Sequence, residues 1–161
     1  MRIAVDFDGT LFEEEEAIRN AARDVVGRDL TMEEFRRLDK ETRAKIYRKS
    51  IEDYADLFRP IRPMIELVNS LKAAGHSIIV VTGRPRSSED KVRYILDKHG
   101  VKYDEIMCRE DLGVKDEVWK TRKFVEHDID IIIEDKLENL NFIRDNVKDR
   151  RTIIIGMLLS I

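Results

Sequence analysis

Two carboxylates directly follow an apolar run in the segment RIAVDFDGT, which spans residues 2–10. Residues 2–7 predict a β-strand, and the Asp-Gly-Thr sequence at its end predicts a turn. Because side chains two positions apart on a strand point the same way, Asp6 and Asp8 are expected to converge on one ligand. Two neighbouring carboxylates repel each other, which favours a cation or a shared proton between them. A strand that merely ends in a solvated polar turn is the alternative that this segment alone leaves open.

Two further apolar runs also end in polar groups. Residues 78–81 are followed by Thr82, Gly83 and Arg84, and residues 131–133 are followed by Glu134 and Asp135. Together with the first segment, these strand ends supply hard oxygen ligands for Mg²⁺ from two strands. They also supply a hydroxyl and backbone N–H groups that suit a phosphate.

Short apolar runs alternate with amphipathic stretches along the chain, which predicts an α/β fold with a largely parallel sheet between helices. Strands are predicted at 2–7, 77–82, 104–108, 130–134 and 152–155, and helices at 13–26, 31–49, 50–58, 63–74, 88–99, 116–127 and 137–146. Thr31 and Glu34 have the spacing of a capping box, which marks the start of the second helix.

Three predicted helices separate the first two strands without an intervening strand. A plain crossover needs only about a dozen residues and one helix. We therefore divide the chain into a core, residues 1–11 and 60–161, and a small helical insert, residues 12–59. The insert follows the carboxyl end of the first strand, where open α/β sheets bind ligands, so we expect it to cap a site. A helical decoration that only extends the core is the alternative.

Composition excludes several classes of protein. The chain is 42% hydrophobic, and its 30 Lys and Arg and 33 Asp and Glu residues give a formal charge of −3. Disorder is disfavoured, and no basic excess supports binding to long nucleic acid. The single cysteine, Cys108, excludes an intramolecular disulfide. Because no apolar run reaches the roughly 18 residues of a membrane span and no signal peptide is evident, we expect a cytoplasmic protein without a membrane partner.

Taken together, the strand-end motifs resemble those of a known family. Asp6-Phe7-Asp8-Gly9-Thr10, Thr82-Gly83-Arg84 and Glu134-Asp135 are similar, in this order, to the first, second and fourth motifs of the haloacid dehalogenase superfamily of phosphatases. The resemblance implies a Rossmann-like parallel sheet with Asp6 as the nucleophile. It also implies a Mg²⁺ ion held by carboxylates, for which we expect Asp6, Asp8, Glu134 and Asp135.

The third motif of that family is a lysine on the helix before the Glu-Asp strand. The sequence offers Lys115, Lys120 and Lys123. We favour Lys115, because it begins its predicted helix and because Asp111 stands four residues before it, where the two side chains pair. Lys120 is the second choice, and for Lys123 a solvated helix face is the better interpretation.

The resemblance implies a mechanism with a covalent aspartyl-phosphate on Asp6. Asp8 gives its proton to the leaving group and then takes one from water. The cation and Lys115 screen the phosphate charge, and Thr82 with the following backbone N–H at Gly83 holds the transferred oxygens.

Arg84 and Arg109 are expected to bind the substrate, because a guanidinium binds oxyanions through two hydrogen bonds. For Arg84, a surface position in a Gly-Arg-Pro turn is an equal alternative.

The substrate class remains open at the level of sequence. Residues 82–115 are similar to the 3′-phosphatase domain of phage polynucleotide kinase-phosphatases, with Arg84, Arg109, Asp111 and Lys115 at matching positions. This favours a polynucleotide that ends in a 3′-phosphate. The small insert and the net charge instead favour a small phosphorylated metabolite such as a nucleotide, which we prefer. A catalytically silent binding or assembly module on the same fold is the third hypothesis, and the apolar end at 153–161 is a candidate oligomer contact.

Overall fold

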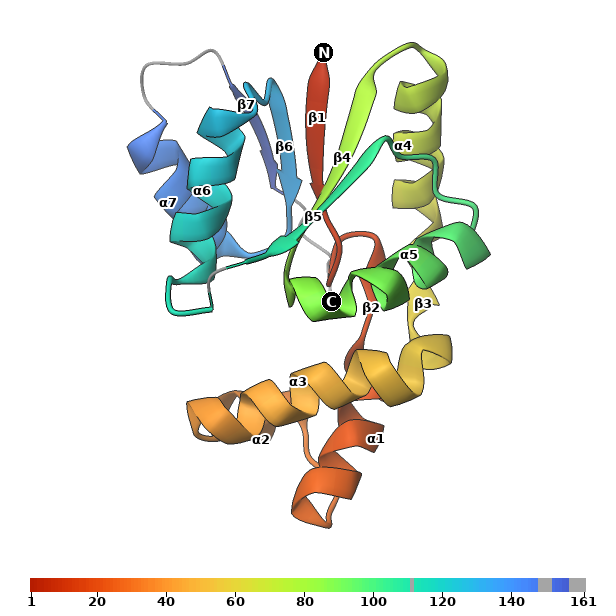
Figure 1. Ribbon diagram of the computed structural model, residues 1–161, viewed down its shortest axis with the longest axis vertical. Coiled ribbons are helices and arrows are strands. Elements are labelled where there is room, and N and C mark those ends of the chain that lie inside the picture. The colour runs from red at the N-terminus through yellow and green to blue at the C-terminus, as the bar shows by residue number, and fades with distance from the viewer. Residues whose placement is uncertain (111, 148–151, 157–161) are drawn as a thin grey trace.

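The computed structural model describes residues 1–110, 112–147 and 152–156, and its centre is a parallel sheet (Figure 1). The five strands are β1 (Arg2–Asp6), β4 (Ser77–Pro85), β5 (Glu105–Arg109), β6 (Ile131–Glu134) and β7 (Ile153–Gly156), in the order β5-β4-β1-β6-β7. All four neighbouring pairs are parallel, which confirms the predicted α/β class. The strand order reverses direction between β1 and β6. Parallel sheets bind ligands beyond the carboxyl ends of their strands at such a point.

Helices cover both faces of the sheet (Figure 1). One face packs against α4 (Arg62–Ala73) and α5 (Glu89–Lys98), and the other packs against α6 (Asp116–Glu126) and α7 (Leu137–Asn146). Along β1, Ile3 and Val5 belong to the first of these apolar clusters, and Ala4 belongs to the second. Since strand side chains alternate, Asp6 lies on the same side as Ala4 and therefore faces α6.

The segment between β1 and β4 forms the helical insert, which lies beyond the carboxyl ends of the strands (Figure 1). It contains α1 (Glu15–Val26), α2 (Met32–Arg37), α3 (Lys40–Tyr54) and the 3₁₀ turn η1 (Ala55–Leu57). Two short strands at its ends, β2 (Phe12–Glu13) and β3 (Arg59–Pro60), pair with each other in antiparallel fashion. The insert also has its own apolar cluster, made of Ile18, Ala21, Ala22, Leu30, Phe35 and Ile46.

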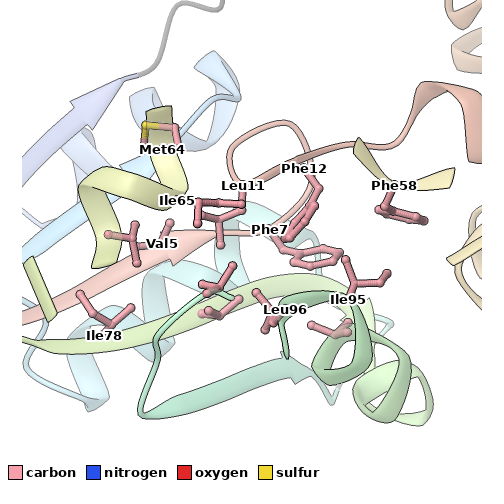
Figure 2. Packing of buried hydrophobic residues seen from close by; sticks show 14 of the residues in the cluster. Val5, Phe7, Leu11, Phe12, Phe58, Met64, Ile65, Ile78, Ile95 and Leu96 are labelled. Carbon is pink, nitrogen blue, oxygen red and sulfur yellow. The ribbon is translucent and has the colours of Figure 1, made fainter. Parts of the chain in front are cut away.

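Aromatic packing fixes the base of the insert to the core (Figure 2). The ring of Phe7 lies 5.1 Å from that of Phe12 and 5.9 Å from that of Phe58, measured between centroids. All three side chains are buried in the same cluster as Val5 and Leu11. The two chain segments that lead into and out of the insert are therefore part of the sheet's own core.

The structure corrects the helices that we predicted within the insert. Residues 31–49 were expected to form one helix, but they form α2 and the first part of α3, separated at Leu38 and Asp39. Asp39 has an extended backbone and its carboxylate accepts a hydrogen bond from the Thr42 N–H at 2.9 Å, so it caps a new helix. The predicted separate helix at 50–58 is instead the end of α3 followed by η1. The capping box of Thr31 and Glu34 is confirmed.

Among the described residues, no helix combines the length and the apolar character that crossing a bilayer requires.

Replacing Asp39 with alanine tests this helix boundary. Because Asp39 caps α3, the Asp39→Ala variant should lose about 1 kcal/mol of unfolding free energy in urea denaturation. In a continuous helix the same change would raise stability, since alanine is the better helix former. Glu41→Ala is the matched control, because this side chain is 79% exposed and serves only an ion pair with Lys45. An Asp39→Ala protein as stable as the parent would contradict the assignment.

Candidate active site

Three carboxylates from two adjacent strands meet at the point where the strand order reverses. Asp6 ends β1, Glu134 ends β6, and Asp135 follows it. One oxygen from each lies within 4.8 Å of the others. Carboxylate oxygens are the donors that Mg²⁺ prefers, so the residues present fit this ion. Asp8 is not a member of this group.

A buried lysine neutralises two of these acids. The Nζ of Lys120 lies 2.6 Å from Asp6 Oδ1 and 2.7 Å from Glu134 Oε2. Lys120 shares the sheet-facing side of α6 with Phe124, four residues further on, which packs in the core. This places the ammonium at the end of β1, on the side to which Asp6 points.

Our expectation for Lys115 is not met by the geometry. Lys115 is exposed and has an extended backbone at the N-cap of α6, so its side chain does not share the buried face of the helix. The spacing argument that favoured it applies equally to Asp116 and Lys120, whose side chains lie 3.6 Å apart. Asp111, the expected partner of Lys115, lies outside the described residues.

Glu134 acts as an acceptor for four donors. Its Oε1 accepts from the backbone N–H groups of Asp135 and Lys136, each at 3.1 Å. Its Oε2 accepts from Lys120 and, at 2.9 Å, from the Asn139 side chain. Burial opposes the charge of Glu134, but Lys120 and these hydrogen bonds outweigh it and lower the pKa to about 2. Both oxygens are therefore engaged in holding the site together.

The other two acids are destabilised as anions. Burial raises the pKa of Asp6 well above its usual value despite the opposing charge of Lys120, and the Glu134 carboxylate adds to the increase. Burial and the charge of Glu134 likewise raise the pKa of Asp135. Such crowding of carboxylates is relieved by a bound cation.

Close packing around Asp135 explains the glycine of the first motif. Gly9 has a left-handed backbone, with φ of 77°, and a Cβ at this position would lie 2.3 Å from Asp135 Oδ2. The Thr10 hydroxyl donates to Asp135 Oδ1 at 3.3 Å. The turn after β1 is therefore shaped to let Asp135 approach the backbone.

Asp8 has a different cationic partner from Asp6. The Arg84 Nε lies 3.0 Å from both oxygens of Asp8, and its Nη2 lies 2.6 Å from Oδ1. Arg84 is fully buried, so the interpretation of it as a surface turn residue is wrong. Its Nη1 donates to the Tyr47 backbone carbonyl at 2.9 Å, and the guanidinium lies 4.2 Å from the centre of the Tyr47 ring. Because Tyr47 belongs to α3, Arg84 connects Asp8 to the insert.

Two adjoining cavities lie over these groups. The inner one, of about 130 Å³, is lined by Asp6, Asp8, Tyr47, Gly83, Arg109, Asp116, Lys120 and Lys136. The outer one, of about 760 Å³, shares Asp8, Tyr47, Arg109 and Lys136 with it and extends under the insert. The inner cavity thus brings both aspartates of the first motif to one space.

The remaining predicted residues fall at different places around the inner cavity. Arg109 lines both cavities, and its buried Nε has no hydrogen-bond partner within the described part of the chain. Gly83 lines the inner cavity and lets the Asp116 carboxylate approach, because a Cβ there would lie 2.4 Å from Asp116 Oδ1. Thr82 is buried, is absent from the residues that line either cavity, and its hydroxyl accepts from the Arg84 N–H at 3.2 Å.

Sequence reasoning missed four residues of the site. Asp116 and Lys136 carried usable signals: Asp116 stands four residues before Lys120, and Lys136 directly follows the Glu-Asp pair. Asn139 and Tyr47 carried none, because they lie on helices that only the folded chain brings to the strand ends.

Comparison with known proteins gives the fold. No family model and no curated protein matches the chain. Solved structures match with TM-scores above 0.6: a chain of the Pnkp1/Rnl/Hen1 complex (0.62, 17% identity), a haloacid dehalogenase-superfamily hydrolase from Geobacter sulfurreducens (0.65, 14%) and a hydrolase of family IA from Entamoeba histolytica (0.61, 17%). They cover 98%, 96% and 97% of this chain. The chain spans 47% of the Pnkp1-complex chain, and 85% and 83% of the other two. It therefore has the haloacid dehalogenase fold.

Removing the buried lysine should destabilise the protein strongly. Lys120→Met leaves Asp6 and Glu134 buried without a counter-charge, which should lower the unfolding free energy by about 3–5 kcal/mol in urea denaturation. The matched control Lys115→Met, on the exposed residue at the start of the same helix, should change it by less than about 0.5 kcal/mol. If the two changes lowered the unfolding free energy equally, the ion pairs of Lys120 would not contribute substantially to stability.

Proposed function

We propose that this protein is a Mg²⁺-dependent phosphomonoester hydrolase that forms an aspartyl-phosphate on Asp6 and acts on a small phosphorylated metabolite. One observation carries the proposal. The carboxylate of Asp6 lines a small cavity while it is held by a buried ammonium and lies within ligand distance of two further acids. A nucleophilic carboxylate that must approach a phosphate dianion needs compensating positive charge, which Lys120 and a cation bound among these acids would supply.

Asp6 and Asp135 are the side chains that we assign to the cation. Both oxygens of Glu134 already accept hydrogen bonds, and Asp8 is bound by Arg84, so we now leave these two residues out of the direct ligands. When bound, Mg²⁺ supplies charge neutralisation for the phosphoryl oxygens.

The residues of the chain divide the reaction between them. An oxygen of Asp6 attacks phosphorus in line, so that an Asp6 O–P bond forms as the bond to the leaving oxygen breaks. Lys120, which replaces Lys115 in this role, holds Asp6 in place and offsets the phosphoryl charge. Asp8 donates a proton to the leaving oxygen, and its carboxylate then takes a proton from the water that cleaves the Asp6 O–P bond. Arg109 and the Gly83 backbone line the cavity where the phosphoryl oxygens would lie.

Arg84 is a positioning residue in this scheme and no longer a substrate ligand. Its guanidinium uses Nε and Nη2 on Asp8 and Nη1 on the Tyr47 carbonyl. Because these donors are already engaged, Arg84 orients the carboxylate of Asp8, which serves as acid and base, and does not itself bind the phosphate. The ion pair must loosen when Asp8 takes up the proton that it delivers.

A polynucleotide 3′-phosphatase is the second candidate. The fold of this chain matches that of a chain in the Pnkp1/Rnl/Hen1 complex, which is named an RNA repair complex in a second solved structure. This match supports the second candidate. The insert beyond the strand ends argues for a smaller substrate, because the outer cavity lies between insert and core. A catalytically silent module is disfavoured because Asp6 and Asp8 both line the inner cavity, each beside a buried cation.

The nucleophile is tested directly with p-nitrophenyl phosphate. The parent protein should hydrolyse it with Mg²⁺ and lose activity in excess EDTA, and Asp6→Asn should reduce kcat by roughly a thousand-fold or more. Lys115→Met serves as the control and should keep the parental rate. Hydrolysis that survives both EDTA and Asp6→Asn would sink the proposal. A panel of nucleoside phosphates, sugar phosphates and a 3′-phosphorylated oligonucleotide separates the two enzymatic candidates.

Arg84→Lys distinguishes positioning from substrate binding. A lysine keeps the charge but not the two-pronged contact with Asp8, so kcat should fall by about tenfold or more while KM changes little. A raised KM with an unchanged kcat would instead indicate that Arg84 binds the substrate. Far-UV circular dichroism and the midpoint of thermal unfolding check that the variant is folded.

A further inference from the structure

The outer cavity has walls of opposite charge. Its core side is lined by the acids Asp8, Asp135 and Glu138, and Glu14 at the start of the insert adds a fourth acid. Two cations, Arg109 and Lys136, also lie on this side. The facing side, from α2 and α3, carries Arg36, Lys40 and Arg43. At about 760 Å³ the outer cavity is much larger than the inner cavity, so it has room for the organic part of a ligand whose phosphate occupies the inner cavity.

The three cations of the insert lack acidic partners. Across the ranges that the structure describes, no ion pair joins Arg36, Lys40 or Arg43 to a carboxylate. Three basic residues that point elsewhere on the same helices do have such partners: Arg37 pairs with Glu33, Lys45 with Glu41 and Lys49 with Asp53. Arg48 of α3 is exposed, lines neither cavity and also has no ion pair among the described residues, so what sets Arg36, Lys40 and Arg43 apart is that they line the outer cavity.

The spacing of these residues indicates that one side of α3 faces the site. Lys40, Arg43 and Tyr47 stand three and four residues apart, so they share one side of the helix. Tyr47 indicates the direction of this side, because its carbonyl accepts from Arg84 and the residue lines both cavities. Lys40 and Arg43 therefore face the outer cavity, which Asp8 also lines.

An unsatisfied buried donor marks the same wall. Arg43 Nε is buried, and it has no hydrogen-bond partner among the described residues. Arg109 Nε, on the opposite wall, is in the same condition. Buried donors are ordinarily paired, so an acceptor supplied by a bound ligand would satisfy either group.

We propose that Arg36, Lys40 and Arg43 form a subsite for a second anionic group, so that the preferred substrate is a small phosphomonoester with another phosphate or carboxylate remote from the scissile one. This rests on the proposed function, which places the scissile phosphate in the inner cavity. Ile18, Met32 and Phe35 line the rest of the outer cavity and suit the organic body between the two anions. Binding of such a substrate would place its second anion beside three cations that have no acidic partner among the described residues.

The test uses matched pairs of non-hydrolysable anions. Alkane bisphosphonates with two to six carbons between their phosphonates are compared with alkyl monophosphonates of equal length, as competitive inhibitors of p-nitrophenyl phosphate hydrolysis. A parallel series of carboxyalkyl phosphonates distinguishes a second phosphate from a carboxylate. At the best length, the second anion should tighten inhibition by about tenfold or more.

Variants test whether residues of the insert cause the tighter inhibition that the second anion gives. Arg43→Met and Lys40→Met should each reduce the gain severalfold, and the double variant should abolish it. Arg37→Met, on a neighbouring but ion-paired arginine, is the control and should retain it. No gain at any length, or a gain that survives the double variant, would overturn the subsite. A 3′-phosphorylated oligonucleotide that is hydrolysed with higher kcat/KM than every small bis-anionic ester would also overturn it.

Failure of the subsite is distinguishable from failure of the proposed function. Titration calorimetry with the same compounds in Mg²⁺ measures the gain without turnover. Hydrolysis of p-nitrophenyl phosphate without any gain contradicts the subsite alone. Absence of hydrolysis contradicts the proposed function, while the calorimetric gain still decides whether the second-anion subsite exists.

Discussion

The buried ammonium of Lys120 between Asp6 and Glu134 is the interaction on which the arrangement of the site depends. It connects the end of β1 with α6 and the end of β6, two consecutive elements that lie far from β1 in the chain. Away from water, each of the three charges is tolerable only because the others are present. Glu134 holds the lysine with the help of Asn139 and two backbone N–H groups, which leaves the raised-pKa carboxylates of Asp6 and Asp135 facing each other. The reversal of strand order places the carboxyl ends of β1 and β6 next to each other. The ion pairs of Lys120 then set the balance of charge at this edge of the sheet.

A second buried ion pair, between Asp8 and Arg84, gives the two aspartates of one motif different surroundings. Asp6 is bound by a lysine from the core, whereas Asp8 is bound by an arginine that also contacts the insert through Tyr47. The chemistry of Asp8 is thereby coupled to the position of α3. The aromatic packing of Phe7, Phe12 and Phe58 anchors the base of the insert to the same core, so both ends of this connection rest on rigid structure.

The division of the space above the strands follows from these two ion pairs. The inner cavity has charged groups of both signs and fits a small, highly charged group. The outer cavity combines apolar side chains with the cations of the insert, and in the proposed function it would hold the leaving group. In this scheme the core supplies the reaction and the insert supplies the selection of substrate, although the two meet at Arg84 and Tyr47.

Three features could be predicted from the sequence alone: the alternation of strands and helices, the acids at the ends of two strands and the presence of a helical insert. These features are local: apolar periodicity, a capping box and polar residues directly after an apolar run are visible in neighbouring positions. The sequence did not reveal the break at Asp39, because the cap competes with a helical pattern that continues on both sides. The folded chain was needed to show that Lys120 rather than Lys115 contacts Asp6, and that Arg84 binds Asp8 from 76 residues away. The reason is physical: which helix face packs on the sheet, and which charges become buried together, depends on contacts between segments that are distant in the chain.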